Sequence, residues 1–532
     1  MADSITLLLS QPNSDDSSQS PHLEGHLPSL DSTIESCIGN FSWAQFLQAI
    51  LVSFAWFFDS QQSFISVFAD AEPLWHCNSS TRLRNNTSSY NRISDLCHLP
   101  TDSCSWDLPR HTSTISEWDL QCAGTIITGL PASAFFMGCL IGGFVLATLA
   151  DSSLGRKKML SFSCLAMAMS TLLTAFANNL WTYSALRFIC GFSRSTINTS
   201  ALVLSTELAS KRWRGQVGVI GFFCFTLGFL SLPAIAYVNI GYTWRNLYLL
   251  TSIPTILYSL VVHFYVLESP RWLFIKGRKE EAVEILKTMA ETNNESLTVS
   301  FSYLSFKEET SNVDFYSAIK ILIEKKWSFR RLLAVMAIGF GVGLDYYGMP
   351  LALGNLPFNL YLSVTLNALS ELPASLIAFF FIGNLNRRTP IMVFCILSGI
   401  CSIMSVLKEV KTYTTLQIGL ELVSFFSACS AFNILLIYTT ELFPTCVRIS
   451  AVSMVRQAIV LGGVFSPVLT AAGRGDGFVS YGVFGIMIMC FGLFVVYLPE
   501  TKGRAICDTM EEEEYKSKTA LTCGFTSYRN DV

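Results

Sequence analysis

Charged and aromatic side chains interrupt several long apolar stretches of this sequence. In the first stretch, Trp56, Asp59 and Gln62 follow one another at intervals of three residues, so a helix would place them on one face. A carboxylate beside an indole ring could hold a quaternary ammonium group through charge and cation–π attraction. Burying such a charge in lipid is costly, which makes this face a candidate binding surface for a small organic cation. The alternative is a hydrated Asp59 near the outer end of its stretch.

Basic residues in two later stretches suit the opposite charge. Arg194 and Asn198 are four residues apart and would share a helix face, and Arg456 lies in a stretch closer to the end of the chain. Arg194 could pair with a buried carboxylate or with a carboxylate of a ligand. A site that combines carboxylates with arginines would suit a zwitterion, because each end of the ligand would meet its counter-charge.

A third group of polar residues lies in the stretch 331–353. Asp345, Tyr346 and Tyr347 follow a glycine-rich segment that permits close helix contact, and all three are candidate binding residues. For each tyrosine, packing between helices is the alternative role.

Two glutamates in later apolar stretches are candidates for coupling to an ion. Glu371 precedes Pro373, which favours a structural or coupling role, and Glu421 is a second buried carboxylate. Asp59 and Asp345 could carry a proton as well, and the sequence does not choose among the four.

Membrane-spanning helices are the elements that must carry these residues. Of the 532 residues, 51% are hydrophobic and 14% are charged, whereas soluble domains carry about 25% charged residues. A helix needs about 20 apolar residues to cross a bilayer. Twelve such stretches predict an all-α membrane protein: 41–66, 125–150, 159–177, 181–205, 216–238, 245–267, 331–353, 358–383, 390–407, 414–440, 449–472 and 478–498.

The stretches fall into two halves of six, separated by a long polar segment. We predict two six-helix bundles, a central loop with short helices, and a polar tail at each end. Motifs recur in both halves at nearly constant spacing, Thr206-Glu207-Leu208 with Thr440-Glu441-Leu442 among them, which indicates a parallel repeat around a central cavity. The predicted boundaries are 1–40 for the N-terminal tail, 41–267 for the first bundle, 268–330 for the central loop, 331–498 for the second bundle and 499–532 for the C-terminal tail.

The distribution of Lys and Arg sets the expected orientation. Most of these residues fall in loops on the side of the N-terminus, so both termini are expected to be cytosolic. The loop 67–124 is then non-cytosolic, and it concentrates cysteines and glycosylation sequons. Four cysteines in an oxidising compartment predict two disulfides, which could be connected in three ways. The alternative is that all four cysteines are free thiols. The cysteines are Cys77, Cys97, Cys104 and Cys122, and the sequons begin at Asn78, Asn85 and Asn86.

The composition argues against several other classes of function. A net charge of −3 gives no electrostatic footprint for a nucleic-acid partner. The sequence contains no phosphate-binding P-loop motif, and its six histidines form no cluster within the apolar stretches. We therefore predict no enzyme activity, no metal site and no cofactor.

Several motifs resemble those of membrane transporters. The segment 142–158 reads GGFVLATLADSSLGRKK and, together with RFICG at 187–191, resembles the signatures of the major facilitator superfamily. The cysteine- and sequon-bearing first loop combines with three further motifs in a pattern similar to the organic ion transporter family. These motifs are ESPRWL at 268–273, ELFPTCVR at 441–448 and PETKGR at 499–504.

Two other segments resemble the plant organic cation/carnitine branch of that family. They are FSWAQFLQAILVSFAWFFDSQQSF at 41–64 and YYGMPLAL at 346–353. The resemblance implies the major facilitator fold, with twelve transmembrane helices in two six-helix bundles. It also implies a secondary transporter that moves small organic cations or carnitine by alternating access. An organic anion or sugar transporter of the same superfamily, or a transporter-like receptor or sensor, is the alternative.

The resemblance further implies roles for individual residues. Tyr346 and Tyr361 match positions that line the family's cavity. In animal relatives, residues at three positions set the substrate selectivity. These positions correspond to Val460, Asn198 and Leu202 here, which differ from the residues of the relatives, so their selectivity rule does not apply to this sequence. A set of charged residues, most of them near the cytosolic ends of spans, is expected to form a gate in which opposite charges pair across the two bundles. The alternative is that these charges only set the orientation of the chain in the membrane. The gate candidates are Asp151, Arg156, Arg187, Glu207, Arg214, Arg387, Glu441, Arg448 and Glu500.

The substrate's charge decides which energy source is needed. A monovalent cation gains about 2.3 kcal/mol per 100 mV on entering the negative side, whereas concentrating a zwitterion requires coupling to a proton or sodium ion. Asp3, followed by Leu7 and Leu8, resembles an acidic dileucine sorting signal and favours the vacuolar membrane over the plasma membrane. We expect a monomer surrounded by membrane lipid.

Overall fold

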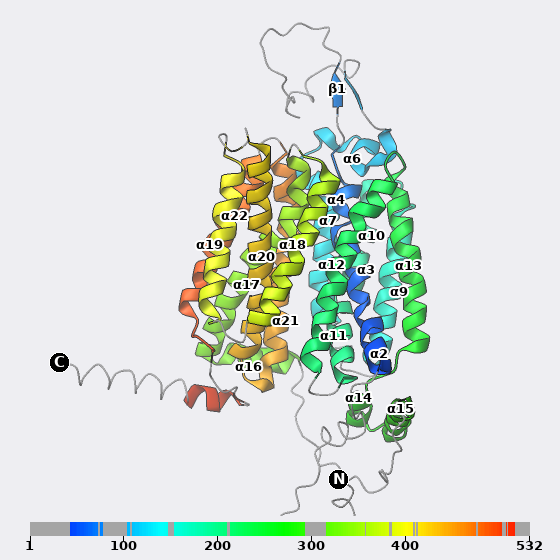
Figure 1. Cartoon of the computed structure of the whole chain (residues 1–532), viewed down its shortest axis with the longest axis vertical. Coiled ribbons are helices and arrows are strands. Elements are labelled where there is room, and N and C mark those ends of the chain that lie inside the picture. Colours follow the sequence, from blue (N-terminus) through cyan, green and yellow to red (C-terminus); the bar gives the residue numbers. More distant parts are fainter. Residues whose placement is uncertain are drawn as a thin grey trace, which may run out of the picture.

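Long apolar helices make up most of the structure, a computed structural model in which two helical bundles stand side by side (Figure 1). Polar segments lie at both ends of the bundles. We call the end with β1, β2 and α6 the upper side and the end with α14 and α15 the lower side, as drawn in Figure 1. The structure describes residues 43–72, 75–77, 104–106, 109–146, 154–209, 213–292, 315–356, 358–381, 386–407, 410, 413–474, 477–502, 507 and 509–515.

The N-terminal bundle contains six helical spans, two of which are built from more than one helix. The first span is α2, α3 and α4, and the fourth is α10 and α11. Two short strands and three short helical turns cap the upper side between the first two spans. The elements are α2 (Trp43–Ser53), α3 (Ala55–Phe64), α4 (Ser66–Ala69), β1 (Trp75–Cys77), β2 (Cys104–Trp106), η3 (Arg110–Thr112), α6 (Thr114–Glu117), η4 (Leu120–Cys122), α7 (Thr125–Val145), α9 (Arg156–Thr174), α10 (Leu180–Arg194), α11 (Ile197–Glu207), α12 (Arg214–Val238) and α13 (Trp244–Tyr265).

The C-terminal bundle follows three helices on the lower side. Its last span opens with a π-helical segment, η8, on the upper side and ends in a 3₁₀ segment, η9. The elements are α14 (Pro270–Ile275), α15 (Lys279–Thr292), α16 (Phe315–Glu324), α17 (Lys326–Ala352), η6 (Leu353–Asn355), α18 (Leu360–Phe381), α19 (Arg388–Ser405), α20 (Thr414–Leu442), α21 (Thr445–Ala472), η8 (Phe478–Gly482), α22 (Val483–Gly492) and η9 (Leu493–Tyr497).

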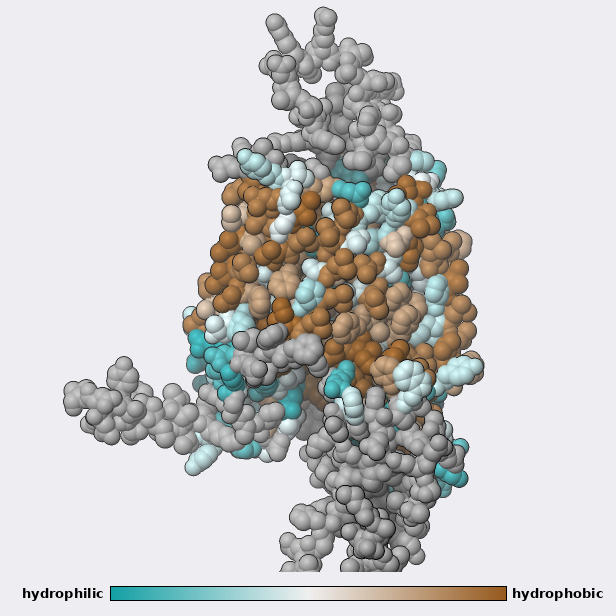
Figure 2. Space-filling view, in the orientation of Figure 1, coloured by the Kyte–Doolittle hydropathy of each residue, from teal (hydrophilic) through white to brown (hydrophobic). Residues whose placement is uncertain are grey.

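On the face shown in Figure 2, apolar side chains cover the middle of both bundles, and more polar side chains lie toward the two ends. Within the described ranges, nine helices are long and apolar enough to cross a membrane. The other three expected spans correspond to α2–α4, α9 and α10–α11. Polar residues lower the apolar character of these three spans, and breaks at Phe54, Ile65 and Ser195–Thr196 shorten the individual helices of two of them. These are also the spans that carry Asp59 and Arg194.

One feature of the upper side differs from the all-helical expectation. Strands β1 and β2 pair antiparallel, with Trp75 opposite Trp106 and Cys77 opposite Cys104. Long apolar stretches in the sequence do not indicate such a pair, because each strand has only three residues and lies in a long polar loop.

The two bundles meet closely along α7 and α21. The hydroxyl of Ser133 donates to the carbonyl of Val464 at 2.8 Å. A Cβ on Gly129 would lie 2.9 Å from the backbone oxygen of Pro467, so this approach requires glycine. A second contact between the bundles joins α12 and α18.

A short connection ties the lower helices to the N-terminal bundle. The Glu268 carboxylate accepts backbone N–H groups from Arg156 at 3.0 Å and Lys157 at 3.1 Å, at the start of α9. Ser269 caps α14 by accepting the N–H of Trp272 at 3.2 Å. Trp272 then packs against α15 through a buried cluster of Trp272, Leu273 and Ala282. Helix α15 is therefore anchored to α9 through α14.

Candidate functional site

An ion pair occupies the centre of the N-terminal bundle. Arg194 of α10 donates from Nε to Asp59 Oδ1 at 2.6 Å and from Nη2 to Oδ2 at 2.7 Å. Asn198 of α11 adds a third hydrogen bond to Oδ2 at 2.9 Å. Asp59 is 0% exposed. Its charge is therefore compensated inside the bundle, and Arg194 has the buried carboxylate that the sequence allowed as one of its partners.

The other residues predicted to share a face with Asp59 are engaged by their own bundle. Trp56 packs edge-on against Phe222, with ring centroids 5.2 Å apart. Gln62 donates to the Thr251 hydroxyl at 3.2 Å and accepts from the Thr171 hydroxyl at 3.1 Å. Both side chains are buried. The predicted face forms, but helix packing covers it in this state of the protein.

Arg187 lies inside the N-terminal bundle rather than at its lower end. It is 1% exposed, donates to the carbonyl of Gln62 at 3.1 Å and stands 4.3 Å from the centre of the Phe135 ring. These contacts fit a structural role inside the bundle more closely than a role in a gate at its lower surface.

A carboxylate hydrogen-bonded to a tyrosine lies where the C-terminal bundle faces the N-terminal one, and aromatic rings pack around that tyrosine. The Tyr346 hydroxyl donates to Glu371 Oε1 at 2.7 Å, and Glu371 Oε2 is buried without a hydrogen-bond partner among the described residues. The Tyr346 ring stacks on Phe432 at 4.9 Å and on Phe425 at 5.9 Å. Across the interface, Phe64 of α3 lies 6.2 Å from Tyr346.

Tyr347 and Arg456 complete this side of the interface. The Tyr347 ring lies 4.7 Å from Phe136 of the opposite bundle. Arg456 of α21 is partly exposed and donates to the Thr199 hydroxyl of α11 at 3.2 Å. It is also within electrostatic range of Asp59 and Tyr347. The interface therefore brings Asp59, Arg194, Tyr347 and Arg456 together from both bundles.

Asp345 does not join the neighbouring tyrosines at the interface. It is 0% exposed inside the C-terminal bundle and accepts from the Ser398 hydroxyl at 2.7 Å. Consecutive residues of an α-helix point about 100° apart, so Asp345 faces inward where Tyr346 and Tyr347 face the other bundle. Glu421 is likewise internal and accepts from Asn367 at 3.1 Å.

Tyr361 closes the upper side of the interface. Its ring stacks on Phe68 of α4 at 5.6 Å and meets Tyr237 of α12 edge-on at 5.8 Å. These contacts join the two bundles above the Tyr346–Glu371 pair, so Tyr361 belongs to the upper closure.

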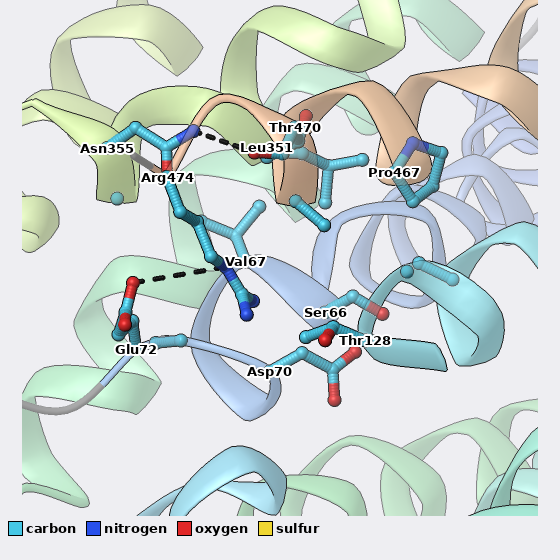
Figure 3. Close-up of a pocket in the computed structure, with 15 residues that line it drawn as sticks. Ser66, Val67, Asp70, Glu72, Thr128, Leu351, Asn355, Pro467, Thr470 and Arg474 are labelled. Carbon is cyan, nitrogen blue, oxygen red and sulfur yellow. Dashed lines mark hydrogen bonds and ion pairs between the residues drawn. The ribbon is translucent and has the colours of Figure 1, made fainter. Parts of the chain in front are cut away.

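A pocket beside this closure contains charges that the sequence reasoning missed (Figure 3). Glu72, just after α4, pairs with Arg474, just after α21, at 3.9 Å across the two bundles. Burial raises the pKa of Glu72, and Arg474 only partly opposes this effect. Asp70 accepts from Thr114 at 2.7 Å and from Tyr183 at 2.9 Å. The available signal was that Arg474 is one of few basic residues on the side predicted to be non-cytosolic.

The predicted gate residues form similar clusters in the two bundles. In the C-terminal bundle, Glu500 accepts the backbone N–H groups of Arg387 at 2.8 Å and Arg388 at 3.2 Å. Arg387 also pairs with Glu441 at 3.0 Å. Glu268 takes the place of Glu500 in the N-terminal bundle, where it accepts from Arg156 and Lys157. The hydrogen bonds named here run within a bundle, whereas the predicted gate pairs run across the bundles.

The repeat extends to the next pair of arginines. Arg214 donates from Nε to the carbonyl of Ala209 at 3.4 Å, and Arg448 donates in the same way to Phe443 at 3.4 Å. Glu207, the counterpart of Glu441, is partly exposed, and its Oε2 has no hydrogen-bond partner among the described residues. Asp151 lies outside those residues.

The predicted loop chemistry can be placed only in part. Cys122 of η4 is disulfide-bonded. Cys77 and Cys104 are register partners in the β1–β2 pair. Cys97 and the sequon residues Asn78, Asn85 and Asn86 lie outside the described residues.

Comparison with known proteins places the chain in a family. The "Sugar (and other) transporter" family model matches residues 76–512. The chain is 61% identical over 524 residues to Organic cation/carnitine transporter 3 of Arabidopsis thaliana, covering 97% of this chain and 98% of that protein. Organic cation/carnitine transporter 2 of the same plant is 56% identical, with 92% and 94% covered.

A solved structure shows the same fold. The partially occluded, inward-open xylose transporter XylE from E. coli superposes with a TM-score of 0.58 at 16% sequence identity, covering 88% of this chain and 100% of that one. The predicted all-α membrane fold of twelve spans in two bundles is thereby confirmed. With the sequence relatives and the interface geometry, these findings show that the chain belongs to the plant organic cation/carnitine transporters of the major facilitator superfamily.

Proposed function

We propose that this protein is a secondary transporter that moves small organic cations, carnitine among them, across a membrane by alternating access. The observation that carries the proposal is the Glu371 carboxylate at the interface between the bundles. Its Oε2 is buried without a hydrogen-bond partner among the described residues. Tyr346 donates to the carboxylate, and phenylalanine rings pack around Tyr346. A carboxylate beside aromatic rings attracts a quaternary ammonium through charge and cation–π contact.

Basic residues extend the site to zwitterions. Arg456 comes from the C-terminal bundle and Arg194 from the N-terminal bundle, and the carboxylate of carnitine would interact with this side. Arg194 becomes available to a substrate when its hydrogen bonds to Asp59 are broken. The residues proposed to bind substrate are Trp56, Asp59, Gln62, Arg194, Asn198, Tyr346, Tyr347, Tyr361, Glu371 and Arg456. Those that lie outside the interface act by holding the others in place. Asp345 faces the inside of its bundle and is not among them.

The energy source follows from the charge of the substrate. An organic cation enters the negative side down the voltage, whereas carnitine needs a coupled proton or sodium ion. The carboxylates available for coupling are Asp59, Asp345, Glu371 and Glu421. The lower-side charge clusters are proposed to stabilise each bundle as it rocks, and the Glu72–Arg474 pair is proposed to close the upper side.

The setting of the protein is proposed on the sequence signals. Both termini face the cytosol, and the upper side faces the lumen of the vacuole, with the plasma membrane as the alternative. The upper loop carries glycans and disulfides. The functional unit is a monomer in contact with lipid.

Transport by purified protein in liposomes tests the proposal. We expect labelled tetraethylammonium and carnitine to exchange across the membrane and to compete with each other. Glu371→Gln should reduce exchange at least tenfold, while Glu280→Gln, on the exposed surface of α15, should leave it unchanged. Exchange of an organic anion or a hexose in place of both compounds would overturn the proposed substrate class.

A further inference from the structure

A group of buried polar residues lies inside the C-terminal bundle, away from the interface just described. Asp345 of α17 is 0% exposed and Glu421 of α20 is 2% exposed, and the two carboxylates interact electrostatically. Asn367, Gln417 and Tyr481 lie among them and are each 0% exposed. We call these five residues the C-bundle polar cluster.

No basic group in the described part of the chain compensates the two carboxylates. Among the described residues, they interact electrostatically with each other and with Cys395, Cys429 and Tyr481, and none of these is Lys, Arg or His. The N-terminal bundle differs, because there Arg194 neutralises Asp59. Two unpaired ionised carboxylates in a dry interior are unstable, and such a pair keeps a proton.

Four residues of the cluster contain polar atoms that lack a hydrogen-bond partner within the described part of the chain. They are Asp345 Oδ1, Asn367 Oδ1, the Tyr481 hydroxyl, and both the oxygen and the nitrogen of the Gln417 amide. Tyr481 is within electrostatic range of both carboxylates. Gln417 precedes Glu421 by one helical turn and shares its face. Buried polar groups are normally satisfied, so these atoms indicate a missing bonding partner.

The local backbone also marks this place. Tyr481 lies in the π-helical segment η8, and its carbonyl accepts from the Ser402 hydroxyl at 2.8 Å. Isolated π-helical turns are rare and occur frequently at functional sites. Gln417 lies in the first turn of α20, so the cluster extends toward the upper side of the bundle (Figure 1).

We propose that the C-bundle polar cluster is a proton-binding site, in which Asp345 and Glu421 hold one exchangeable proton that drives transport. The proposal deepens the proposed transport function and rests on it. A proton fits better than a metal ion because, among the described residues, no group of three or more His, Cys, Asp or Glu side chains could hold a metal. The two hydrogen bonds to the carboxylates come from neutral side chains. Ser398 donates to Asp345 at 2.7 Å, and Asn367 donates to Glu421 at 3.1 Å.

The bonding pattern indicates how the proton is held. With a proton on Glu421, the carboxyl group can donate to Asn367 Oδ1, which otherwise lacks a donor. When the proton leaves toward the upper side, the site returns to two carboxylates, and their repulsion favours rebinding of a proton. Protonation thus changes the charge at the centre of one bundle without any contact with the organic substrate.

The test separates proton coupling from substrate binding. Wild-type protein, Glu421→Gln and Asp345→Asn are reconstituted in liposomes, with Glu280→Gln as the control. Exchange of labelled carnitine at equal pH on both sides is compared with its accumulation under a pH difference of one unit, applied in either polarity. One pH unit can drive up to about tenfold accumulation for each coupled proton.

We expect Glu421→Gln and Asp345→Asn to keep exchange within about twofold of wild type and to lose the accumulation driven by pH. Unchanged accumulation in both variants overturns the proton site and leaves the proposed function intact. Absence of exchange by the wild type with any organic cation overturns the proposed function itself. A requirement for Na⁺ at constant pH that Glu421→Gln abolishes overturns the assignment to a proton.

A second measurement does not depend on transport. The infrared carbonyl band of protonated carboxyl groups should be weaker in Glu421→Gln than in wild type and unchanged in Glu280→Gln. If neither carboxylate variant folds, Tyr481→Phe replaces them, because it removes the hydroxyl without a change of charge. We expect it to shift the pH at which accumulation is half-maximal, and an unshifted profile would contradict the proposal.

Discussion

Arg194 holds Asp59 with two parallel hydrogen bonds in the interior of the N-terminal bundle, at 2.6 and 2.7 Å. The arrangement leaves neither charge unpaired while the upper side is closed. Any step that frees Arg194 for a substrate carboxylate must therefore give Asp59 another partner for its charge. The pair links the bonding of one side chain to the availability of the other.

This pair predicts a specific pattern of stability. Asp59→Asn and Arg194→Gln should each destabilise the protein by about 3–5 kcal/mol, because each leaves an uncompensated buried charge. The double variant should recover a large part of the loss. Thermal unfolding of the detergent-purified proteins measures this, and a double variant that is as unstable as the sum of the single ones would contradict it.

Closure of the upper side should depend on pH through Glu72. Burial raises the pKa of this carboxyl in the closed form, so the closed form binds a proton more tightly than an open, hydrated form does. Acidification from neutral pH into the range just above the ordinary glutamate value should therefore favour closure, and raising the pH should oppose it. In Glu72→Gln this pH dependence should disappear.

A cysteine introduced at Asn355, in the pocket beside Glu72 and Arg474, can report this closure. Its labelling by a membrane-impermeant maleimide should slow on acidification, after correction for the reactivity of a free thiol. Faster labelling at low pH, or an unchanged pH dependence in Glu72→Gln, would refute the assignment.

Close contact between the bundles should be sensitive to a single methyl group. Gly129→Ala would place a Cβ 2.9 Å from the Pro467 backbone, so the upper parts of α7 and α21 could not approach as they do here. We expect exchange to fall at least fivefold and maleimide labelling at position 355 to increase. Gly124→Ala is the matched control, because nothing lies within 4 Å of the added carbon. Equal effects of the two substitutions would exclude the steric explanation.

Glu268 and Glu500, which accept the equivalent backbone hydrogen bonds on the lower side of the two bundles, should differ in their contribution to stability. Burial opposes the ionisation of both carboxyl groups, and hydrogen bonds from backbone N–H groups favour it. At Glu500 the hydrogen bonds outweigh burial, so the pKa is lowered. At Glu268 burial outweighs the hydrogen bonds, so the pKa is raised. Glu500→Gln should therefore cost about 1–3 kcal/mol at neutral pH, and Glu268→Gln should cost less.

Acid should remove the difference between wild type and Glu500→Gln. A carboxyl with a lowered pKa contributes stability that is present above its unfolded value and is lost as pH falls through its folded value. Unfolding temperatures measured from neutral pH down to about pH 3 would show the two proteins begin to converge below the ordinary glutamate pKa of about 4.3. Convergence of Glu268→Gln with wild type in the same way would contradict the assigned directions.

The sequence predicted the architecture because long apolar stretches leave few alternatives in a membrane. It also indicated that Asp59 and Arg194 matter, since charges are rare in such stretches. It could not show that they pair, because that depends on how α3 and α10 are rotated against each other. The β1–β2 strands and the Glu72–Arg474 pair escaped prediction for a related reason. They depend on which segments meet in space on the upper side.

Asp345 shows the limit of reasoning from neighbours in sequence. It precedes Tyr346 and Tyr347, yet it faces the inside of its bundle while they face the other one. A helical pattern gives relative directions along one helix, and only the packing of the bundle decides which direction is inward. The lower-side motifs show what a repeat can give, because the same spacing occurs twice and folds into the same hydrogen bonds twice. The gate predicted across the bundles stays a prediction.

The link from Glu268 to α14 and α15 has a mechanical consequence. Glu268 connects the lower helices to the first turn of α9 through backbone hydrogen bonds, and a Cβ on Gly155 would collide with that carboxylate. We therefore expect α15 to move together with the N-terminal bundle if that bundle rotates. A fluorophore attached to α15 would then report the orientation of the bundle from outside the membrane, and a partner bound to α15 would restrain that rotation.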